Sequence, residues 1–210
     1  MAWTYEQTFN SLSGGDLNGQ DSWGGGTNNT RFDVQSSVVF EGANAVSNTQ
    51  PGDASSSEIV RTVTGINSGI VYVSIRRTAA AGNLSIKLGE SASSKMYVVM
   101  DTLGNIVTLS GALFTSNTIQ AYSNDTWYRI GIEFDNVGQP NKFRANVDGG
   151  SFTSWLDVTN TSYTNIDEIH LDSSDAISGV TDYYDFISPN YTASATTNIF
   201  MPQLLTMKVG

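Results

Sequence analysis

Two acidic side chains that lie two positions apart could carry acid–base chemistry if a β-strand holds them. Side chains alternate between the two faces of a strand, so Glu133 and Asp135 would project from the same face. Glycoside hydrolysis uses a pair of carboxyl groups held close together in this way. The pair comes where a strand runs into a loop, so we expect a solvent-exposed strand end. The nearest other pairing is Asp182 with Asp185.

The chain has one histidine, His170, and no cysteine. These counts exclude a histidine-rich zinc site and a cysteine–histidine dyad. A serine–histidine–aspartate triad needs only one histidine, but no Gly-x-Ser-x-Gly turn is present to hold the serine. A lone histidine on a strand is more often part of the polar face than a base. These residue types favour a protein that is not an enzyme.

Aromatic and basic side chains make a better case for binding. A sugar is held by a planar aromatic ring against its apolar face and by fixed polar groups at its hydroxyls. Aromatic residues in sheet proteins are more often part of the core than of a binding surface. The combination of arginine and tyrosine on one polar face is what supports the binding hypothesis. The candidate ligand-binding residues are Tyr72, Arg76, Lys87, Tyr97, Trp127, Arg129 and Arg144.

Strands must position these side chains, and residues 124–150 show the clearest strand pattern. Apolar and polar side chains alternate over 128–135 and again over 142–148, and residues 136–141 between them favour a turn. This pattern predicts an antiparallel hairpin that is buried on one face. A second layer must cover that face, which indicates a β-sandwich.

Shorter runs typical of strands occur along most of the chain. Apolar residues are nowhere sustained at helical spacing, and no repeat of fixed period is visible. We predict an all-β protein, an antiparallel two-sheet β-sandwich with at most a short helix. The further candidate strands are 37–40, 59–63, 70–76, 84–88, 96–100, 106–109, 166–171 and 180–187.

The composition is that of one globular domain. The chain has 210 residues, 39% of them hydrophobic, and its composition does not change along the interior. Its net charge is -10 and its basic residues are not grouped, which argues against a nucleic-acid partner. No secretory signal and no membrane-spanning stretch are visible. We expect synthesis in the cytosol and no membrane partner.

Three groups of residues resemble, in order, the concanavalin A-like lectin/glucanase jelly rolls, which include laminin-G-like modules. Residues 124–150, with Thr-Trp-Tyr-Arg-Ile at 126–130, are similar to their central hairpin. Segments 17–23 and 39–46 resemble their opening, and 167–171 with 182–187 their closing strands. The resemblance implies two curved antiparallel sheets, and binding more often than catalysis. The Glu-x-Asp-x-x-Glu or Glu-x-Asp-x-Glu run of the superfamily's glycosidases is missing here.

The resemblance also implies a structural Ca²⁺ ion. In similar sugar-binding sandwiches, a carboxylate near the first strand and one from an Asp-Asp pair in the last strand often bind calcium. Glu6 and Asp185 occupy the matching positions in this chain. Phe186 stands where the second acid of the pair is expected, so one oxygen ligand is missing.

Residues 191–210 differ from the jelly-roll domain that we expect over 1–190. After a small polar run, this tail is rich in apolar residues between 199 and 209. Either its own sandwich or a neighbouring subunit must cover such a segment. If a neighbour covers it, the tail is an assembly segment of a homo-oligomer.

Three classes of function remain open. The first is a non-catalytic surface or structural module of a larger particle, such as a virion decoration or fibre protein, with protein partners and a secondary contact with glycans. The second is a carbohydrate-binding module or lectin, and the third is a glycan hydrolase or lyase. The missing export signal, the acidic surface and the apolar tail favour the first class.

Overall fold

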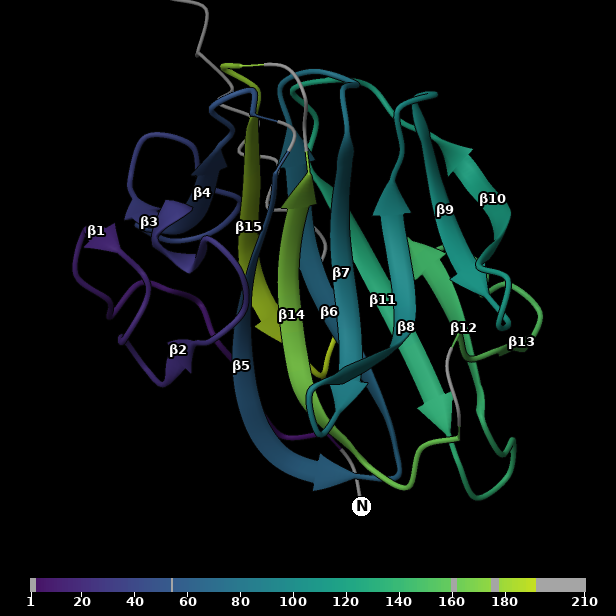
Figure 1. The fold of residues 1–210 in the computed structure, drawn as a ribbon. Helices are drawn as coiled ribbons and strands as arrows, with labels where there is room; N and C mark the ends of the chain where they lie inside the picture. The colour runs from purple at the N-terminus through teal and green to yellow at the C-terminus, as the bar shows by residue number, and fades with distance from the viewer. Residues whose placement is uncertain (1–2, 54, 160–161, 175–177, 192–210) are drawn as a thin grey trace, which may run out of the picture.

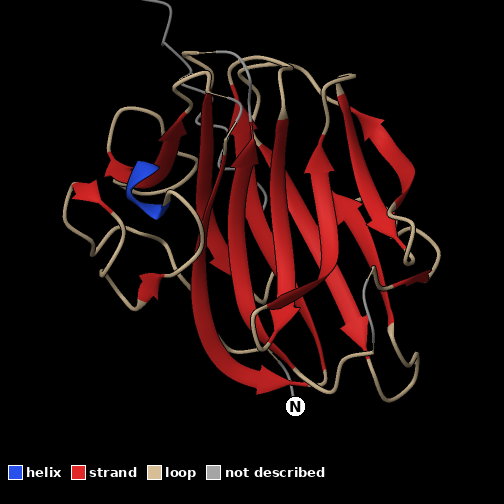
Figure 2. Cartoon of the chain, in the orientation of Figure 1, coloured by secondary structure: helices blue, strands red, loops and turns tan. Residues whose placement is uncertain are grey.

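The computed structural model describes residues 3–53, 55–159, 162–174 and 178–191. Within these ranges the regular structure is β-strand, apart from one 3-10 turn, η1, at Asn29–Arg31 (Figure 2). No helix among them has the length and hydrophobicity that crossing a bilayer requires. The prediction of an all-β protein with at most a short helix is confirmed.

Two antiparallel sheets face each other, and the seven-stranded sheet lies in front in Figure 1. The eight-stranded sheet has the order β1 (Gly15–Asp16), β3 (Phe32–Gln35), β4 (Ala45–Thr49), β15 (Thr181–Ser188), β6 (Ser68–Arg77), β11 (Tyr128–Asp135), β12 (Lys142–Val147) and β13 (Leu156–Asp157). The seven-stranded sheet has the order β10 (Thr115–Ala121), β9 (Asn105–Ser110), β8 (Ser93–Met100), β7 (Asn83–Glu90), β14 (Ile166–Ser174), β5 (Ser56–Ile66) and β2 (Trp23–Gly24).

The predicted hairpin is formed by β11 and β12. Their register pairs Ile130 with Val147 and Phe134 with Phe143, so the apolar sides of both strands share one face. The turn between them is closed by the carboxylate of Asp135, which accepts the backbone N–H groups of Val137 and Gly138. A short acidic side chain that binds the backbone ahead of it is a common turn device.

The core lies between the sheets and comes from the alternate residues of each strand. Ile130, Ile132 and Phe134 of β11 project into it from one sheet, and Leu84 and Ile86 of β7 from the other, all almost fully buried. Each such side chain contributes about 1.5–3 kcal/mol when it leaves water. Apolar and polar side chains therefore alternate along β11 and β7 because each sheet buries one face.

A charged pair is also enclosed in the interior. Arg77 Nε lies 3.1 Å from Asp182 Oδ1, and neither side chain is exposed to solvent. The Arg77 guanidinium also donates to the carbonyl groups of Ala81, Gly82 and Met100. The several hydrogen bonds compensate for the loss of hydration of the two charges.

The N-terminal segment is attached to the last strand. Gln7 and Ile187 exchange two backbone hydrogen bonds, of 2.9 and 2.8 Å. This bridge holds residues 3–7 beside the sandwich. The segment becomes one wall of a cavity described below.

One predicted strand is wrong, and the strands β1, β2, β3, β4, β10 and β13 were not predicted. Residues 37–40 form a loop between β3 and β4. β10 was not predicted because Thr115–Ala121 is an edge strand that is polar on both sides and lacks the alternation of apolar and polar side chains.

The predicted assembly tail, 191–210, lies outside the described residues except for Tyr191. The hydroxyl group of Tyr191 donates to the carbonyl of Asp148 at 2.8 Å. The division into a domain over 1–190 and a tail over 191–210 therefore stays a prediction.

Candidate functional site

Charged side chains gather on the outer face of the seven-stranded sheet. In β14, Ile169 and Leu171 point into the core, so Glu168, His170 and Asp172 point outward. The strands on either side add further charges, since His170 pairs with Lys87 in β7 and Asp172 pairs with Glu58 in β5. We call Glu58, Lys87, Glu168, His170 and Asp172 the His170 cluster.

The His170 cluster is a continuous chain of ion pairs and hydrogen bonds. Glu58 Oε1 lies 3.0 Å from Lys87 Nζ and 3.1 Å from His170 Nδ1. The other ring nitrogen of His170 lies 3.3 Å from Glu168 Oε2, and Lys87 Nζ lies 2.9 Å from Asp172 Oδ2. His170 is 4% exposed. The carboxylates of Glu58 and Glu168 hold its ring from both sides.

The pKa values of two members of the cluster, Glu58 and Asp172, are shifted in opposite directions. The hydrogen bond from His170, together with the charge of Lys87, lowers the pKa of Glu58 to about 2 although burial opposes this shift. Burial raises the pKa of Asp172, and Lys87 only partly offsets it. Glu58 therefore stays an ionised hydrogen-bond acceptor at any physiological pH.

A cavity of about 440 Å³ opens beside the cluster, and we call it the His170 cavity. Its floor is the sheet, and its walls are the loop around β2 and the β7–β8 turn. Both oxygens of Glu168 accept the backbone N–H of Ala92 in that turn, at 2.9 Å. The lining residues are Ser22, Gly24, Gly25, Gly26, Glu58, Val60, Thr62, Ala92, Glu168 and His170.

One wall of the His170 cavity requires a glycine. Gly26 has φ +72°, and a Cβ there would lie 2.2 Å from the carbonyl oxygen of Glu58. Only glycine combines this backbone conformation with such a close approach. The loop can therefore lie directly against β5 at the edge of the cavity.

An aromatic pair extends the same face on the other side of Lys87. Tyr97 in β8 is paired in register with Lys87, whose Nζ lies 5.5 Å from the centre of the Tyr97 ring. Phe114, in the β9–β10 turn, packs edge-on against Tyr97 at 5.6 Å and is 43% exposed. The face thus offers fixed charges and an aromatic surface side by side.

The seven candidate ligand-binding residues are divided between the two sheets. Lys87 and Tyr97 lie on the seven-stranded sheet, in β7 and β8. The other five, Tyr72, Arg76, Trp127, Arg129 and Arg144, lie in β6, β11 and β12 of the eight-stranded sheet or directly before β11. No single outer face therefore carries all seven side chains.

The cations of the eight-stranded sheet are engaged by their neighbours. Arg129 is 1% exposed, donates to Phe186 O and Ser188 Oγ, and stacks on the Phe186 ring at 4.5 Å. Burial lowers the pKa of Arg129 to about 10. This arginine fastens the last strand to the sheet and is closed to a ligand.

The remaining candidates on that face are also paired. Arg144 lies between the rings of Phe152 and Trp155, 4.9 and 4.7 Å from their centres, and binds Glu133 at 2.7 Å. The neighbouring candidates behave alike: Arg76 binds Asp125 at 2.7 Å, Trp127 packs near Tyr183 at 6.3 Å, and Tyr72 is buried against Tyr191 at 5.7 Å.

The two expected calcium ligands have different surroundings. Glu6 is exposed, whereas Asp185 is buried and its Oδ2 accepts the backbone N–H groups of Phe40 and Glu41 at 2.8 and 3.0 Å. Burial raises the pKa of Asp185 to about 6. Among the described residues no group of three or more His, Cys, Asp or Glu could hold a metal. Calcium at Glu6 and Asp185 stays a prediction without support from this geometry.

Four members of the His170 cluster, all except Lys87, were not predicted as site residues. The alternation Glu168-x-His170-x-Asp172 in the sequence shows that these side chains share a face. Nothing in the sequence indicates that Glu58, in a strand far away along the chain, lies beside them. That neighbour comes only from the pairing of β14 with β5.

Comparison with known proteins supports the fold. No family model matches the chain, and no curated protein matches it either. Three similar solved structures are a sialidase (TM-score 0.66, 12% identity, covering 92% of this chain and 18% of that one), the catalytic domain of a glycoside hydrolase family 131 protein from Coprinopsis cinerea (0.57, 12%, 89% and 94%), and a carbohydrate esterase from the Shiga toxin-encoding bacteriophage phi24B (0.53, 15%, 80% and 88%).

These likenesses confirm the predicted fold, an antiparallel two-sheet β-sandwich of the jelly-roll type. At such low identities they concern the fold alone, and a fold hosts many activities. The chain spans less than a fifth of the length of the sialidase.

Proposed function

We propose that this protein binds a glycan on the outer face of its seven-stranded sheet without cleaving it. The observation that carries the proposal is the convergence of Glu58, Glu168 and His170 on one cavity beside an aromatic pair. Fixed polar groups around a cavity, with an aromatic ring next to them, are what sugar recognition requires.

The protonation of Glu58 supports binding over cleavage. A general acid must carry a proton at the working pH, and a carboxyl group with a pKa of about 2 does not. Its bonds to Lys87 and His170 also hold it in place. As an ionised acceptor in a fixed position, Glu58 is suited to hold the hydroxyl group of a sugar.

The names of the similar structures support a glycan ligand, but they do not support binding over cleavage. A sialidase, a glycoside hydrolase and a carbohydrate esterase all act on carbohydrates, and each shares this sandwich. The role in a virion or another larger particle, with homo-oligomerisation through the tail, stays a prediction.

Glycan hydrolysis is the second candidate, and one observation favours it. Glu58 and Glu168 contact opposite nitrogens of His170, and the pKa of Asp172 beside them is raised. Glycosidases use a pair of carboxyl groups with different pKa values. The release of new reducing ends from a bound glycan would favour this candidate over the first.

An oligosaccharide array followed by calorimetry tests the proposal. We expect the wild-type protein to retain at least one class of neutral, amino or acidic glycan and to leave it intact in mass spectra. Glu168→Gln should weaken the affinity about tenfold to a hundredfold, because a hydrogen bond to a charged acceptor is worth about 1.5–3 kcal/mol. Glu133→Gln, on the opposite sheet, is the matched control and should bind like the wild type.

Two results would contradict this function. One is the absence of binding to every glycan on the array. The other is an equal loss of affinity in Glu168→Gln and Glu133→Gln, which would move the site away from the His170 cavity.

A further inference from the structure

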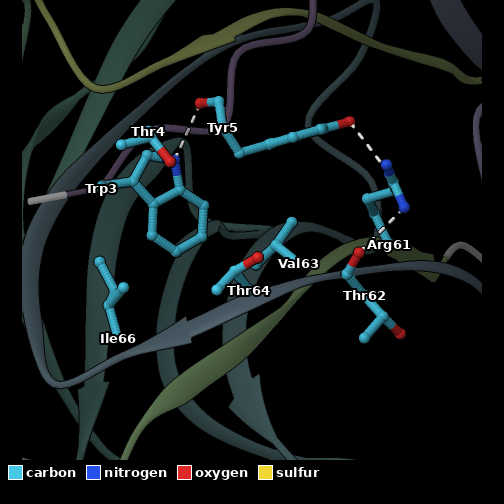
Figure 3. A pocket seen from close by; sticks show the side chains of 8 residues that line it. All are labelled: Trp3, Thr4, Tyr5, Arg61, Thr62, Val63, Thr64 and Ile66. Atoms are coloured by element: carbon cyan, nitrogen blue, oxygen red, sulfur yellow. Dashed lines mark hydrogen bonds between the residues drawn. The ribbon is translucent and has the colours of Figure 1, made fainter.

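A second cavity, of about 410 Å³, lies at the edge of the seven-stranded sheet (Figure 3). Residues 3–5 of the N-terminal segment form one wall, and residues 61–64 with Ile66 of β5 form the other. We call it the Tyr5 cavity. It does not contain any member of the His170 cluster.

The Tyr5 cavity lies where the edge of β5 is uncovered. On one side β5 pairs with β14, and on the other side only β2 pairs with it, at Val60 and Arg61. No other strand of the described chain covers that edge beyond Arg61. The N-terminal segment runs past this edge and leaves the cavity between them.

The two cavities meet at one residue. Thr62 lines both the His170 cavity and the Tyr5 cavity, and it is exposed. A ligand that lies on the outer face of the sheet can therefore continue over Thr62 to the N-terminal segment.

The chemistry of the Tyr5 cavity suits a sugar ring. Trp3 is 4% exposed and forms an apolar surface with Val63 and Ile66, while Thr4 and Thr64 bring exposed hydroxyl groups to the rim. An apolar floor with hydroxyl groups at the rim matches the faces and edges of a pyranose.

The polar end of the cavity is held in place and is not a free charge. Arg61 lies 5.1 Å over the Tyr5 ring, donates from Nε to the Tyr5 hydroxyl at 3.3 Å, and pairs with Asp21 at 3.5 Å. Burial raises the pKa of Tyr5 to about 12, so its hydroxyl group stays neutral. With Asp21 beside Arg61, this end suits a neutral sugar unit more than an anionic one.

We infer that the Tyr5 cavity is a further subsite for the same glycan, so that the ligand is an oligosaccharide that bridges both cavities across Thr62. This inference rests on the proposed function. It adds that affinity depends on chain length, because units in the second subsite bind as part of a ligand already held in the first.

Calorimetry with a length series of the glycan selected on the array tests this inference. We expect the affinity to rise at least tenfold from the monosaccharide to an oligosaccharide that reaches the second cavity. Thr64→Arg, which fills the Tyr5 cavity alone, should remove this gain and leave monosaccharide binding unchanged. Thr118→Arg, at an exposed position in β10 on the far edge of the same sheet, is the matched control and should keep the gain.

A spectroscopic readout on the wild-type protein needs no variant. The indole N–H of Trp3 donates to the carbonyl of Tyr5 at 3.0 Å within the cavity wall. Its ¹H–¹⁵N signal should shift with the oligosaccharide and not with the monosaccharide.

The outcomes separate the two ideas. Affinity that does not depend on length, or an unmoved Trp3 signal, would overturn the second subsite and leave the proposed function standing. Absence of glycan binding would overturn both.

Discussion

At the scale of single residues, the enclosed pair of Arg77 and Asp182 is a point where the fold is sensitive to substitution. Two opposite charges without solvent contact depend on each other, because water cannot replace a missing partner. The surface pair of Arg76 and Asp125 has no such dependence, since the side chain of Asp125 is 60% exposed.

We predict that Asp182→Ala lowers the free energy of unfolding by about 3–5 kcal/mol, because it leaves the Arg77 charge buried without its counter-ion. Asp125→Ala should lower it by at most about 1 kcal/mol. Urea denaturation followed by tryptophan fluorescence measures both variants. Equal losses would show that the interior pair is not special.

At the scale of elements, the loop after β2 owes its place against β5 to Gly26. Positive φ alone is tolerated at a cost, but here a side chain would also collide with the backbone of Glu58. Gly104, in the β8–β9 turn, has a similar φ of +82° with no atom within 4 Å of the Cβ position. A comparison of substitutions at these two glycines therefore distinguishes the cost of a positive φ from the cost of a steric collision.

We predict that Gly26→Ala weakens glycan binding about tenfold and destabilises the protein more than Gly104→Ala does. The loop must move away from β5, which opens the wall of the His170 cavity, whereas Gly104→Ala adds only the cost of strain, about 1–3 kcal/mol. Calorimetry and thermal unfolding of both variants check this expectation. Unchanged glycan affinity in Gly26→Ala would contradict it.

Sequence patterns predicted those elements whose two faces differ in polarity. β11 and β12 alternate cleanly because one face is core, and their register followed. Residues 37–40 look like a strand, yet the Asp185 carboxylate takes the backbone N–H of Phe40 that a neighbouring strand would need. The His170 cluster was out of reach for the same reason, since it depends on contacts between distant segments such as Glu58 and His170.

At the scale of the whole molecule, the two sheets respond to pH in opposite senses. Glu58, on the seven-stranded sheet, has a pKa lowered from 4.5 to about 2, so it contributes stability above pH 4.5 that is lost as the pH falls towards 2. Asp185, on the eight-stranded sheet, has a pKa raised from 3.8 to about 6. The folded state holds that proton longer, so this group reduces stability as the pH rises from 3.8 to 6.

We predict that Asp185→Asn reduces the decline in the free energy of unfolding between pH 4 and pH 6. A shift of this size corresponds to about 3 kcal/mol at most. Glu58→Gln should keep that decline and instead lose the rise between pH 2 and pH 4.5. Urea titrations at a series of pH values measure both slopes, and identical profiles for the two variants would refute the assignment.

The paired hydrogen bonds between Gln7 and Ile187 also bear on the order in which parts of the protein fold during synthesis. They join the beginning of the described chain to its last strand, so this bridge cannot form until β15 has left the ribosome. The contact with the highest sequence separation forms late, because the intervening chain must first be ordered. We therefore expect the bridge that anchors this wall of the Tyr5 cavity to close only after the strands that it joins have formed.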